Sequence, residues 1–176
     1  LINELVKESG VKRNNIVSVV ASGNTTMSTL FLGIFPDYLR LEPFIPPFFK
    51  SPKLNAKEVG LDINPSAGVY LSPNVASYVG GDITSGVLAS GIWANEENVL
   101  FIDLGTNGEI VFGNQDFMMS CACSAGPAFE GGGISCGMRA SAGAVDSVDI
   151  DPDTLVPKLN TIDGEPAIGI CGSGII

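Results

Sequence analysis

The stretch from Phe101 to Phe112, FIDLGTNGEIVF, constrains the fold of this chain more than any other. Residues 98–103 are largely apolar and follow two glutamates, which is typical of a buried strand. Asn107-Gly108 is the strongest short-range signal for a hairpin turn, because asparagine and glycine both adopt positive φ values readily. The stretch therefore predicts a strand, a tight turn at Asn107-Gly108 and a second strand.

The residues at this bend also suggest a chemistry. Asp103 ends the first predicted strand, and residues 105–108 carry little side-chain bulk. Backbone N–H groups in such a turn can bind an anion, and a carboxylate at a strand end can hold Mg²⁺ through water. An ordinary hairpin, in which Asp103 only helps to form the turn, explains the same residues, so both interpretations stay open here.

Composition narrows the class of protein. Hydrophobic residues make up 45% of the 176 residues, charged residues only 16%, and 22 residues are glycine, which favours an α/β protein with sites lined by backbone. The net charge of −10 disfavours a nucleic-acid partner, because no basic patch could neutralise phosphates. It does not disfavour a nucleotide that is bound through Mg²⁺ and backbone amides.

The thiols and the apolar runs bear on metals and location. The four cysteines, at positions 121, 123, 136 and 171, form no C-x-x-C pair, and the chain has no histidine, so we expect no zinc or cluster site. Unpaired thiols without a signal peptide predict a cytoplasmic protein. No apolar run reaches the ~18 residues that a membrane span requires, so no membrane partner is expected.

The first third of the chain alternates helix and strand patterns. Residues 1–9 predict a helix that ends at Gly10, and residues 16–22 predict a strand buried on both faces of a parallel sheet. Residues 23–26 then open a helix with apolar positions at Met27, Leu30, Phe31 and Ile34. This turn is either the N-cap of a core helix or a polar turn that faces a ligand cleft.

The middle of the chain has less regular patterns. Five prolines and three phenylalanines in residues 36–54 predict an extended segment strapped across the domain, with a docking surface as the alternative. Residues 67–71 predict a strand, and a helix follows from Asp82. Gly80-Gly81 before it is a simple loop, an anion or metal contact, or a hinge. Residues 95–97 are the best internal boundary.

The last third is rich in strands and glycine. Strands are predicted at residues 98–103, 108–113, 116–121, 143–150 and 154–159. Residues 124–133 suit close approach of backbone to a ligand, with Glu130 as the single charge, although a mobile surface loop would look the same. Residues 169–174 are typical of a strand-to-helix turn that cradles phosphate, which by itself is weak evidence.

Five segments, in this order, resemble the ATPase domain of the reductive activators of corrinoid proteins, a family that includes related activases of methanogen methylamine methyltransferases. They are SGNTTMSTLFLGI, VASYVGGDITSGVLASGI, FIDLGTNGEIVFG, CSAGPAFEGGGISCGMRASAGAVD and GICGSGII. The resemblance covers nearly the whole chain and is most distinctive over residues 121–146.

The resemblance implies an α/β fold of the actin-like ATPase superfamily, with two ribonuclease-H-like lobes and a nucleotide in the cleft between them. Residues 1–95 would be the C-terminal part of the first lobe. Residues 96–176 would be the N-terminal part of the second lobe, with the phosphate-binding hairpin. The fold would therefore be incomplete, with parts of two lobes.

The resemblance also implies the cofactors and the phosphate-binding turn at Asp103 and residues 105–108, and the glycine-rich segments described above add the other expected site residues. ATP and Mg²⁺ would bind here, with Asp103 as a catalytic residue and metal ligand and Glu130 as a second catalytic residue. The residues expected to contact the nucleotide are Gly105, Thr106, Asn107, Gly108, Gly126, Gly131, Gly172, Ser173 and Gly174.

The function implied for the parent protein is reductive activation in a methyl-transfer system. ATP would let a low-potential electron reach the inactive cob(II)alamin-type cofactor of a corrinoid protein and restore the cob(I) state. A sugar- or acid-kinase-like phosphotransferase, with Asp82 or Glu130 as general base, is an alternative because the superfamily fold does not fix function. A nucleotide-gated docking module without turnover is another, and a homodimer stays open.

Family members carry further parts that residues 1–176 do not show. These are an iron–sulfur domain, a first phosphate turn ahead of the equivalent of Leu1, and an adenosine-contacting segment after the equivalent of Ile176. The chain starts without methionine and closes where a helix begins, so we expect a piece of a longer protein that is not an ATPase in isolation. The resemblance does not carry the iron–sulfur cluster over to Cys121, Cys123 or Cys136.

Overall fold

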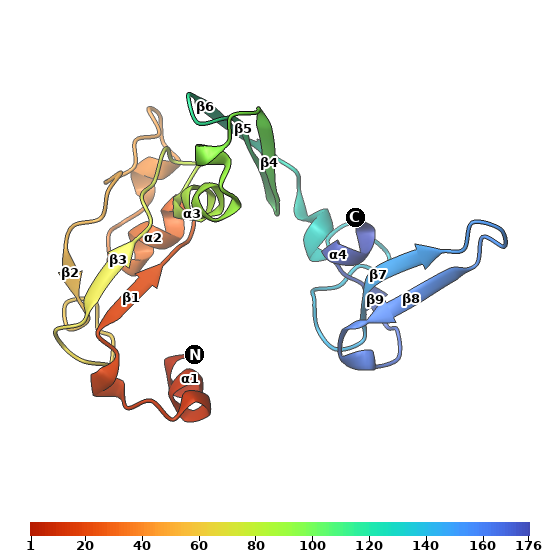
Figure 1. The fold of residues 1–176 in the computed structure, drawn as a ribbon, viewed down its shortest axis with the longest axis horizontal. Coiled ribbons are helices and arrows are strands. Elements are labelled where there is room, and N and C mark those ends of the chain that lie inside the picture. The colour runs from red at the N-terminus through yellow and green to blue at the C-terminus, as the bar shows by residue number, and fades with distance from the viewer. The chain divides into compact units, whose positions relative to one another are not determined.

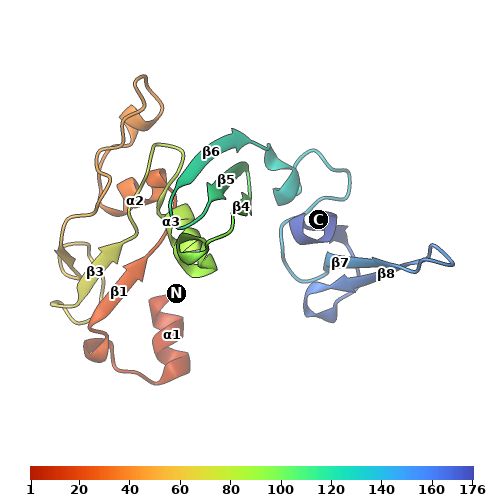
Figure 2. The same cartoon turned by 45° about the horizontal axis from the view of Figure 1, so that its top comes forward.

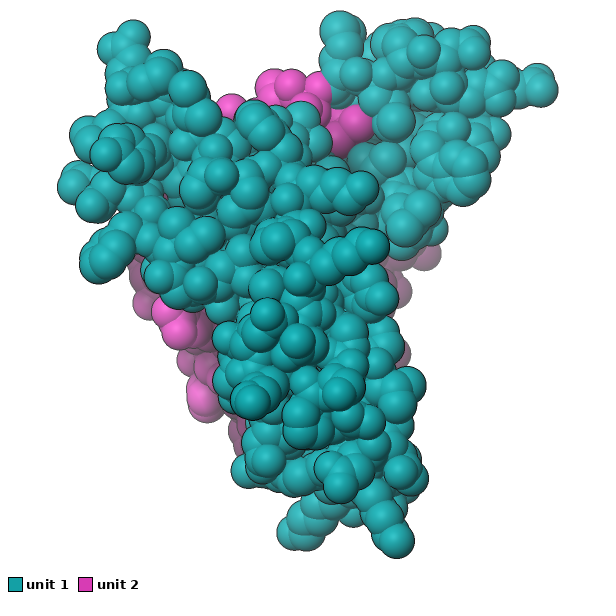
Figure 3. Space-filling model, turned by 90° about the vertical axis from the view of Figure 1, so that its left-hand side faces the viewer, with its two compact units in different colours: residues 1–101, 112–119 teal, residues 102–111, 120–176 magenta.

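The computed structural model describes residues 1–176, which divide into two units. Unit 1 consists of residues 1–101 and 112–119, and unit 2 of residues 102–111 and 120–176 (Figure 3). Both units mix helices with sheets, as the composition predicts. No helix has the length and apolar character needed to cross a bilayer.

Unit 1 is built on a three-stranded sheet in the order β1-β3-β2 (Figure 1). Strands β1 (Ser18–Ala21) and β3 (Gly68–Leu71) are parallel, and the short β2 (Leu54–Asn55) pairs antiparallel to β3. The parallel strand predicted at residues 16–22 is therefore confirmed. Its predicted burial on both faces is wrong, because β1 lies at the edge of the sheet, and Val20 on it is 72% exposed.

The core of unit 1 lies on one face of this sheet. Its main cluster consists of Ala56, Ile63, Ala67 and Val69, with Ile2 from α1 (Ile2–Ser9) packed against them, and unit 1 has further buried residues such as Ile83 and Ile92. The predicted first helix is confirmed, and it ends at Gly10 in the left-handed conformation.

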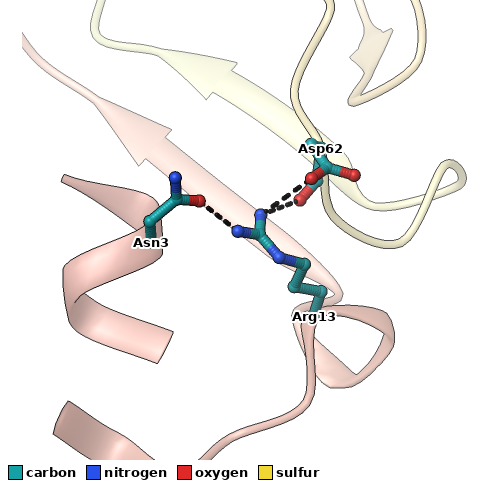
Figure 4. Close-up of polar contacts among 3 residues, drawn as sticks. All are labelled: Asn3, Arg13 and Asp62. Carbon is teal, nitrogen blue, oxygen red and sulfur yellow. Dashed lines mark hydrogen bonds and ion pairs between the residues drawn. The ribbon is translucent and has the colours of Figure 1, made fainter. Parts of the chain in front are cut away.

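Arg13 ties α1 to the rest of unit 1 (Figure 4). It lies in the 3₁₀ turn η1 (Arg13–Asn15) and donates from Nη1 to the carbonyl of Asp62 at 2.7 Å, with the Asp62 carboxylate 3.1 Å away. Its Nη2 donates to the side-chain oxygen of Asn3. One guanidinium therefore joins α1 to the loop that precedes β3.

Helix α2 (Thr25–Phe31) begins as predicted but buries a different face. Asn24 is its N-cap and accepts from the Met27 N–H at 2.9 Å, so the capping interpretation is confirmed. The predicted core position Met27 is 59% exposed, whereas Thr25 and Thr29 are fully buried. Their hydroxyls donate to backbone carbonyls at 2.7 Å, which allows small polar residues to be buried.

Small residues are buried in α2 because a neighbouring backbone comes very close. A Cβ at Gly80 would lie 2.5 Å from the Thr25 nitrogen, and a Cβ at Gly81 would lie 2.8 Å from the Ser72 carbonyl oxygen. These glycines open α3 (Gly81–Ser90), the helix predicted from Asp82, and it ends at Gly91 with φ 75° before the turn η3 (Ile92–Ala94). The distances supply a packing reason for the glycine pair.

The proline-rich segment 36–53 has little regular structure, as predicted; its one helical turn is η2 (Asp37–Leu39). The Phe49 carbonyl accepts from the Asn74 N–H at 2.7 Å, and the Phe44 carbonyl accepts from the Ser77 hydroxyl. The segment is thus strapped to the loop after β3 through its backbone. The Phe44 and Phe49 side chains are 44% and 54% exposed.

A second sheet has the order β4-β5-β6, from β4 (Val99–Leu104), β5 (Asn107–Gly113) and β6 (Met118–Ser124). The three strands are confirmed, but two details of the prediction are wrong. The turn is at Gly105-Thr106, and Gly108 is a strand residue whose Cβ would meet Cys123 Sγ at 3.3 Å. Strand β4 is at the sheet edge, and Ile102 on it is 48% exposed instead of buried.

Unit 2 contains a third sheet in the order β8-β7-β9. Strand β7 (Ala144–Ile150) pairs antiparallel with β8 (Pro157–Thr161) and parallel with β9 (Gly169–Ile170). Both predicted strands at 143–150 and 154–159 are present, and β8 starts later because Asp151 accepts from the N–H groups of Asp153 and Thr154 and holds a turn. The short 3₁₀ turn η5 (Ile162–Gly164) follows β8.

The core of unit 2 is small. Its buried hydrophobic residues are Ala144, Val145 and Cys171, which are 0%, 5% and 1% exposed, together with Val111 of β5 at 3%. Helix α4 (Gly172–Ile175) follows β9 and lies beside β7 (Figures 1 and 2).

Candidate functional site

The bend between β4 and β5 is closed by its own backbone. The Gly105 N–H donates to the Asn107 carbonyl at 3.0 Å. The Thr106 carbonyl accepts from the N–H groups of Ala125 and Gly126, at 3.2 and 3.0 Å. Two segments that the sequence singled out separately, 103–108 and 126–131, are therefore hydrogen-bonded to each other within unit 2.

A side-chain contact joins the same two segments. The Thr106 hydroxyl donates to Oε1 of Glu130. Both side chains are exposed to solvent. The structure thus places one of the two predicted catalytic carboxylates directly on the predicted phosphate turn.

Glu130 is positioned by a short 3₁₀ helix, η4 (Pro127–Glu130), with proline at its start. The residue after it, Gly131, has φ 86°, and a Cβ there would lie 2.5 Å from the Met138 nitrogen. Only glycine fits this position, because both the backbone angle and the space exclude a side chain. The tight packing at Gly131 fixes the end of η4 at which Glu130 lies.

The third glycine-rich segment, 172–174, packs against η4. A Cβ at Gly172 would lie 2.3 Å from the Phe129 carbonyl oxygen, and a Cβ at Gly174 would lie 2.4 Å from the Val145 carbonyl oxygen. Ser173 between them is exposed. The predicted site residues 105–108, 126–131 and 172–174 therefore form one continuous set of contacts in unit 2.

Asp103, the predicted metal ligand, is an exposed residue near the end of β4. No three histidine, cysteine, aspartate or glutamate side chains lie close enough together to hold a metal ion by themselves. Mg²⁺ in nucleotide sites needs fewer protein ligands, since one or two carboxylates, water and the phosphates complete its octahedron. An exposed Asp103 three residues from the Thr106–Glu130 pair fits that donor set.

Asp82, the alternative general base, lies in unit 1. Its Oδ1 accepts from the Ile83 N–H at 2.9 Å, and its own N–H donates to the Gly23 carbonyl at 3.2 Å. These contacts are those of a residue in the first turn of a helix. Asp82 thus belongs to a different unit from Asp103 and Glu130.

Sequence reasoning missed a cluster of hydroxyls at the carboxyl ends of β1 and β3. Ser22, Ser72 and Ser85 have their Oγ atoms 2.7 Å apart in each of the three pairs. Ser22 and Ser72 each directly follow a parallel strand, and this position is the signal that could have revealed them.

The remaining candidates are a hollow and the thiols. The hollow, of about 370 Å³, lies in the proline-rich segment and has no charged lining residue; it is lined by Phe35, Pro36, Tyr38, Leu39, Pro43, Ile45, Pro46 and Pro47.

All four cysteines are free, and Cys171 alone is buried. Cys123 donates to the Gly108 carbonyl at 3.3 Å, and Cys171 to the Val145 carbonyl at the same distance.

The chain matches two family descriptions over almost its full length. Residues 1–95 match the RACo middle region, and residues 97–176 match the C-terminal domain of RACo, the ASKHA domain. ASKHA domains are the actin-like ATPase fold that the resemblance implies.

Individual relatives agree with these matches. The corrinoid activation enzyme RamQ of Eubacterium limosum is 36% identical over 178 residues, which is 100% of this chain and 29% of that protein. The [Co(II) methylated amine-specific corrinoid protein] reductase of Methanosarcina barkeri is 28% identical over 61% of this chain and 24% of its own length.

A solved structure is closer still. The reductive activator for corrinoid, iron–sulfur protein shares 54% of residues with a TM-score of 0.86, over 99% of this chain and 28% of the activator. The matches thus span between 24% and 29% of the length of these relatives. The chain belongs to the RACo family, in which residues 1–95 match the middle region and residues 97–176 match the C-terminal ASKHA domain.

Proposed function

We propose that the intact protein uses ATP to activate a corrinoid protein reductively, by taking its cobalt from Co(II) to Co(I). The observation that carries this proposal is the 54% identity to a reductive activator, which extends over 99% of the chain. The names of RamQ and of the methanogen reductase refer to corrinoid activation and to a corrinoid protein, and both support a corrinoid protein as the substrate.

Within this proposal, unit 2 supplies half of a nucleotide site. Asp103 would hold Mg²⁺, and the bend at residues 105–108 would bind phosphate oxygens. A metal ion bound with the nucleotide would neutralise charge on the phosphates. Glu130 would orient the water that attacks the terminal phosphate, and its hydrogen bond with Thr106 on the bend supports this role.

Gly126, Gly131 and the turn 172–174 have a supporting role in this site. The Gly126 N–H is bonded to Thr106, and the close packing at Gly131 and Gly172 holds η4 in place. Because those contacts position Glu130, we infer that these glycines act by allowing close approach of backbone segments. Ser173, exposed at the start of α4, is the member of that turn with a free hydroxyl to offer to the nucleotide.

ATP is needed in this scheme because the electron transfer is unfavourable by itself. Reduction of Co(II) to Co(I) is uphill for ordinary cellular donors, and each ~59 mV of one-electron deficit lowers the equilibrium constant tenfold. Nucleotide binding and hydrolysis can favour one conformation of a bound corrinoid partner by a few kcal/mol. A few kcal/mol is enough to offset one or two such tenfold losses in the equilibrium constant.

We place the electron source outside residues 1–176. The four cysteines and the carboxylates do not gather into a group that could hold a metal ion or cluster. An iron–sulfur cluster held elsewhere in the intact protein would deliver the electron. We further propose that residues 1–95 belong to the first ribonuclease-H-like lobe and residues 96–176 to the second.

The experiment that tests this function measures ATP hydrolysis by the intact protein with its corrinoid partner. We expect hydrolysis to be faster when the partner is in the inactive Co(II) state than when it is in the Co(I) state. Equal rates with both states would contradict coupling. Transfer of phosphate to a small molecule instead of to water would favour the kinase-like phosphotransferase over the reductive activator.

A further inference from the structure

Glu130 competes with phosphate for the same hydrogen-bond donor. The Thr106 hydroxyl carries a single proton, which it donates to the Glu130 carboxylate in this structure. A phosphate oxygen at the bend would need that proton, so it must displace Glu130 from Thr106 or bind beside it. In either arrangement a carboxylate and a phosphate, both anionic, lie within a few ångströms.

Glu130 cannot leave the bend with its whole segment without breaking other contacts. The Thr106 carbonyl also accepts from Ala125 and Gly126, and the Gly131 backbone is packed against Met138. Movement of the side chain alone keeps the charge close to the bend, because a glutamate reaches only a few ångströms from its backbone. The negative charge is therefore a fixed property of this site.

Almost no basic side chain is available to balance that charge. Residues 58–138 contain no lysine or arginine, so the bend, η4 and their neighbours in sequence have none. Unit 2 as a whole has nine aspartates and glutamates against Arg139 and Lys158. Lysine and arginine are common phosphate ligands, whereas this unit offers a hydroxyl, backbone groups and carboxylates at the bend.

We propose that Glu130 makes this site select nucleotide that carries a divalent cation and reject free phosphate anions. Repulsion by Glu130 disfavours uncomplexed ATP, pyrophosphate and inorganic phosphate. A cation bound to the phosphates converts the repulsion into attraction, because the carboxylate then accepts hydrogen bonds from water around the ion. Glu130 is thus a specificity-determining residue, and this assignment rests on the nucleotide-binding function proposed above.

The test compares binding of ATP to the intact protein with excess Mg²⁺ and with EDTA, by calorimetry or equilibrium dialysis. The wild type should bind ATP with Mg²⁺ and discriminate strongly against ATP in EDTA. Glu130→Gln keeps the shape and an acceptor for Thr106 but removes the charge. We expect it to bind ATP in EDTA and pyrophosphate at least about tenfold more tightly than the wild type, so that the discrimination falls.

Two further variants separate charge from other effects. Glu165→Gln makes the same change of net charge at an exposed position of unit 2 whose side chain does not contact the bend, and it should keep the wild-type discrimination. Glu130→Asp keeps the charge, loses the reach to Thr106 and should also discriminate. Thermal unfolding of each variant would show that it is folded.

The outcomes distinguish this inference from the function on which it rests. Binding of ATP with Mg²⁺ by the wild type, together with unchanged discrimination in Glu130→Gln, would overturn the role of Glu130 and leave the proposed function standing. Equal binding with Mg²⁺ and with EDTA by the wild type would do the same. Failure of the wild type to bind ATP under any condition would overturn both.

Discussion

Two glycine-rich turns, one in each unit, look alike in sequence but differ in the contact that the neighbouring carboxylate makes. Gly80-Gly81 in unit 1 brings the start of α3 against Thr25, and a Cβ at Gly80 would lie 2.5 Å from the Thr25 nitrogen. Gly131 in unit 2 has the same 2.5 Å to the Met138 nitrogen. In both places glycine is required because two backbones touch.

The difference lies in the neighbouring carboxylate. Asp82, next to the glycine pair of unit 1, accepts from the first turn of its own helix. Glu130, next to Gly131, reaches across to Thr106 on a different element. Glycine content therefore indicates close packing, and function must be inferred from the polar side chain that the packing places. The predictions below test this distinction.

The largest effect is expected from Asp103→Ala in the intact protein. Removing the carboxylate should lower ATP hydrolysis by about 10²-fold or more, because Asp103 is the proposed holder of the metal ion and an alanine offers no oxygen in its place. The unfolding free energy should change little, since Asp103 is exposed. Asp116→Ala, at an exposed position in the next turn of the same sheet, is the control and should keep wild-type hydrolysis. Turnover by Asp103→Ala equal to that of the control would refute the site.

Gly80→Ala should destabilise the protein without a specific effect on the nucleotide site. The new Cβ would overlap the Thr25 backbone, and such overpacking costs about 1–3 kcal/mol of unfolding free energy. Gly105→Ala is the matched change in unit 2, where the nearest atom is 3.5 Å away, so stability should hold. Denaturant unfolding checks both, and equal stabilities for the two variants would remove the packing explanation.

Thr29→Val tests the buried hydroxyl face of α2. The hydroxyl donates to the Thr25 carbonyl inside a fully buried environment, and valine has nearly the same volume. Losing this hydrogen bond should lower the unfolding free energy by about 1 kcal/mol. Thr26→Val, on the exposed side of the same helix, should cost less, and urea titrations of the pair would measure the difference.

The smallest effect concerns Asp151, away from both glycine turns. Hydrogen bonds from the Thr154 N–H, then from the Thr154 hydroxyl and the Asp153 N–H, hold the pKa of Asp151 below its ordinary value. A lowered pKa in the folded state gives stability that is present above about pH 4 and is lost as the pH falls through the folded-state pKa. The Asp151→Asn variant should therefore be less stable than the wild type at neutral pH, and the difference in their unfolding free energies should shrink as the pH falls below about 4. A constant gap from pH 7 to pH 3 would disprove the assignment.

Much of the fold was predictable because local patterns and tertiary packing agree. The strands predicted at 108–113 and 143–150 are present as β5 and β7, and Gly10 ends the first helix where its left-handed φ is needed. The motifs that carry the family resemblance also led to the family that the comparisons show.

The predictions that were wrong depended on contacts distant in sequence. Asn107-Gly108 has the chemistry of a turn, yet Gly108 is needed where Cys123 comes within 3.3 Å of its Cβ position. The apolar stripe of α2 is exposed because the approach of Gly80 requires small residues on the opposite face. Thr106 and Glu130 were both expected in the nucleotide site, but their direct contact was not predicted, since 24 residues separate them and no local pattern links the two side chains.

The measurement that tests the central claim most directly is the appearance of the Co(I) absorption band of the corrinoid partner. It is recorded with the intact protein and a low-potential reductant, with and without ATP and Mg²⁺. We predict that the band forms with ATP and not without it, and that Asp103→Ala abolishes the ATP effect while Asp116→Ala preserves it. Reduction at the same rate and to the same extent without nucleotide would contradict the account.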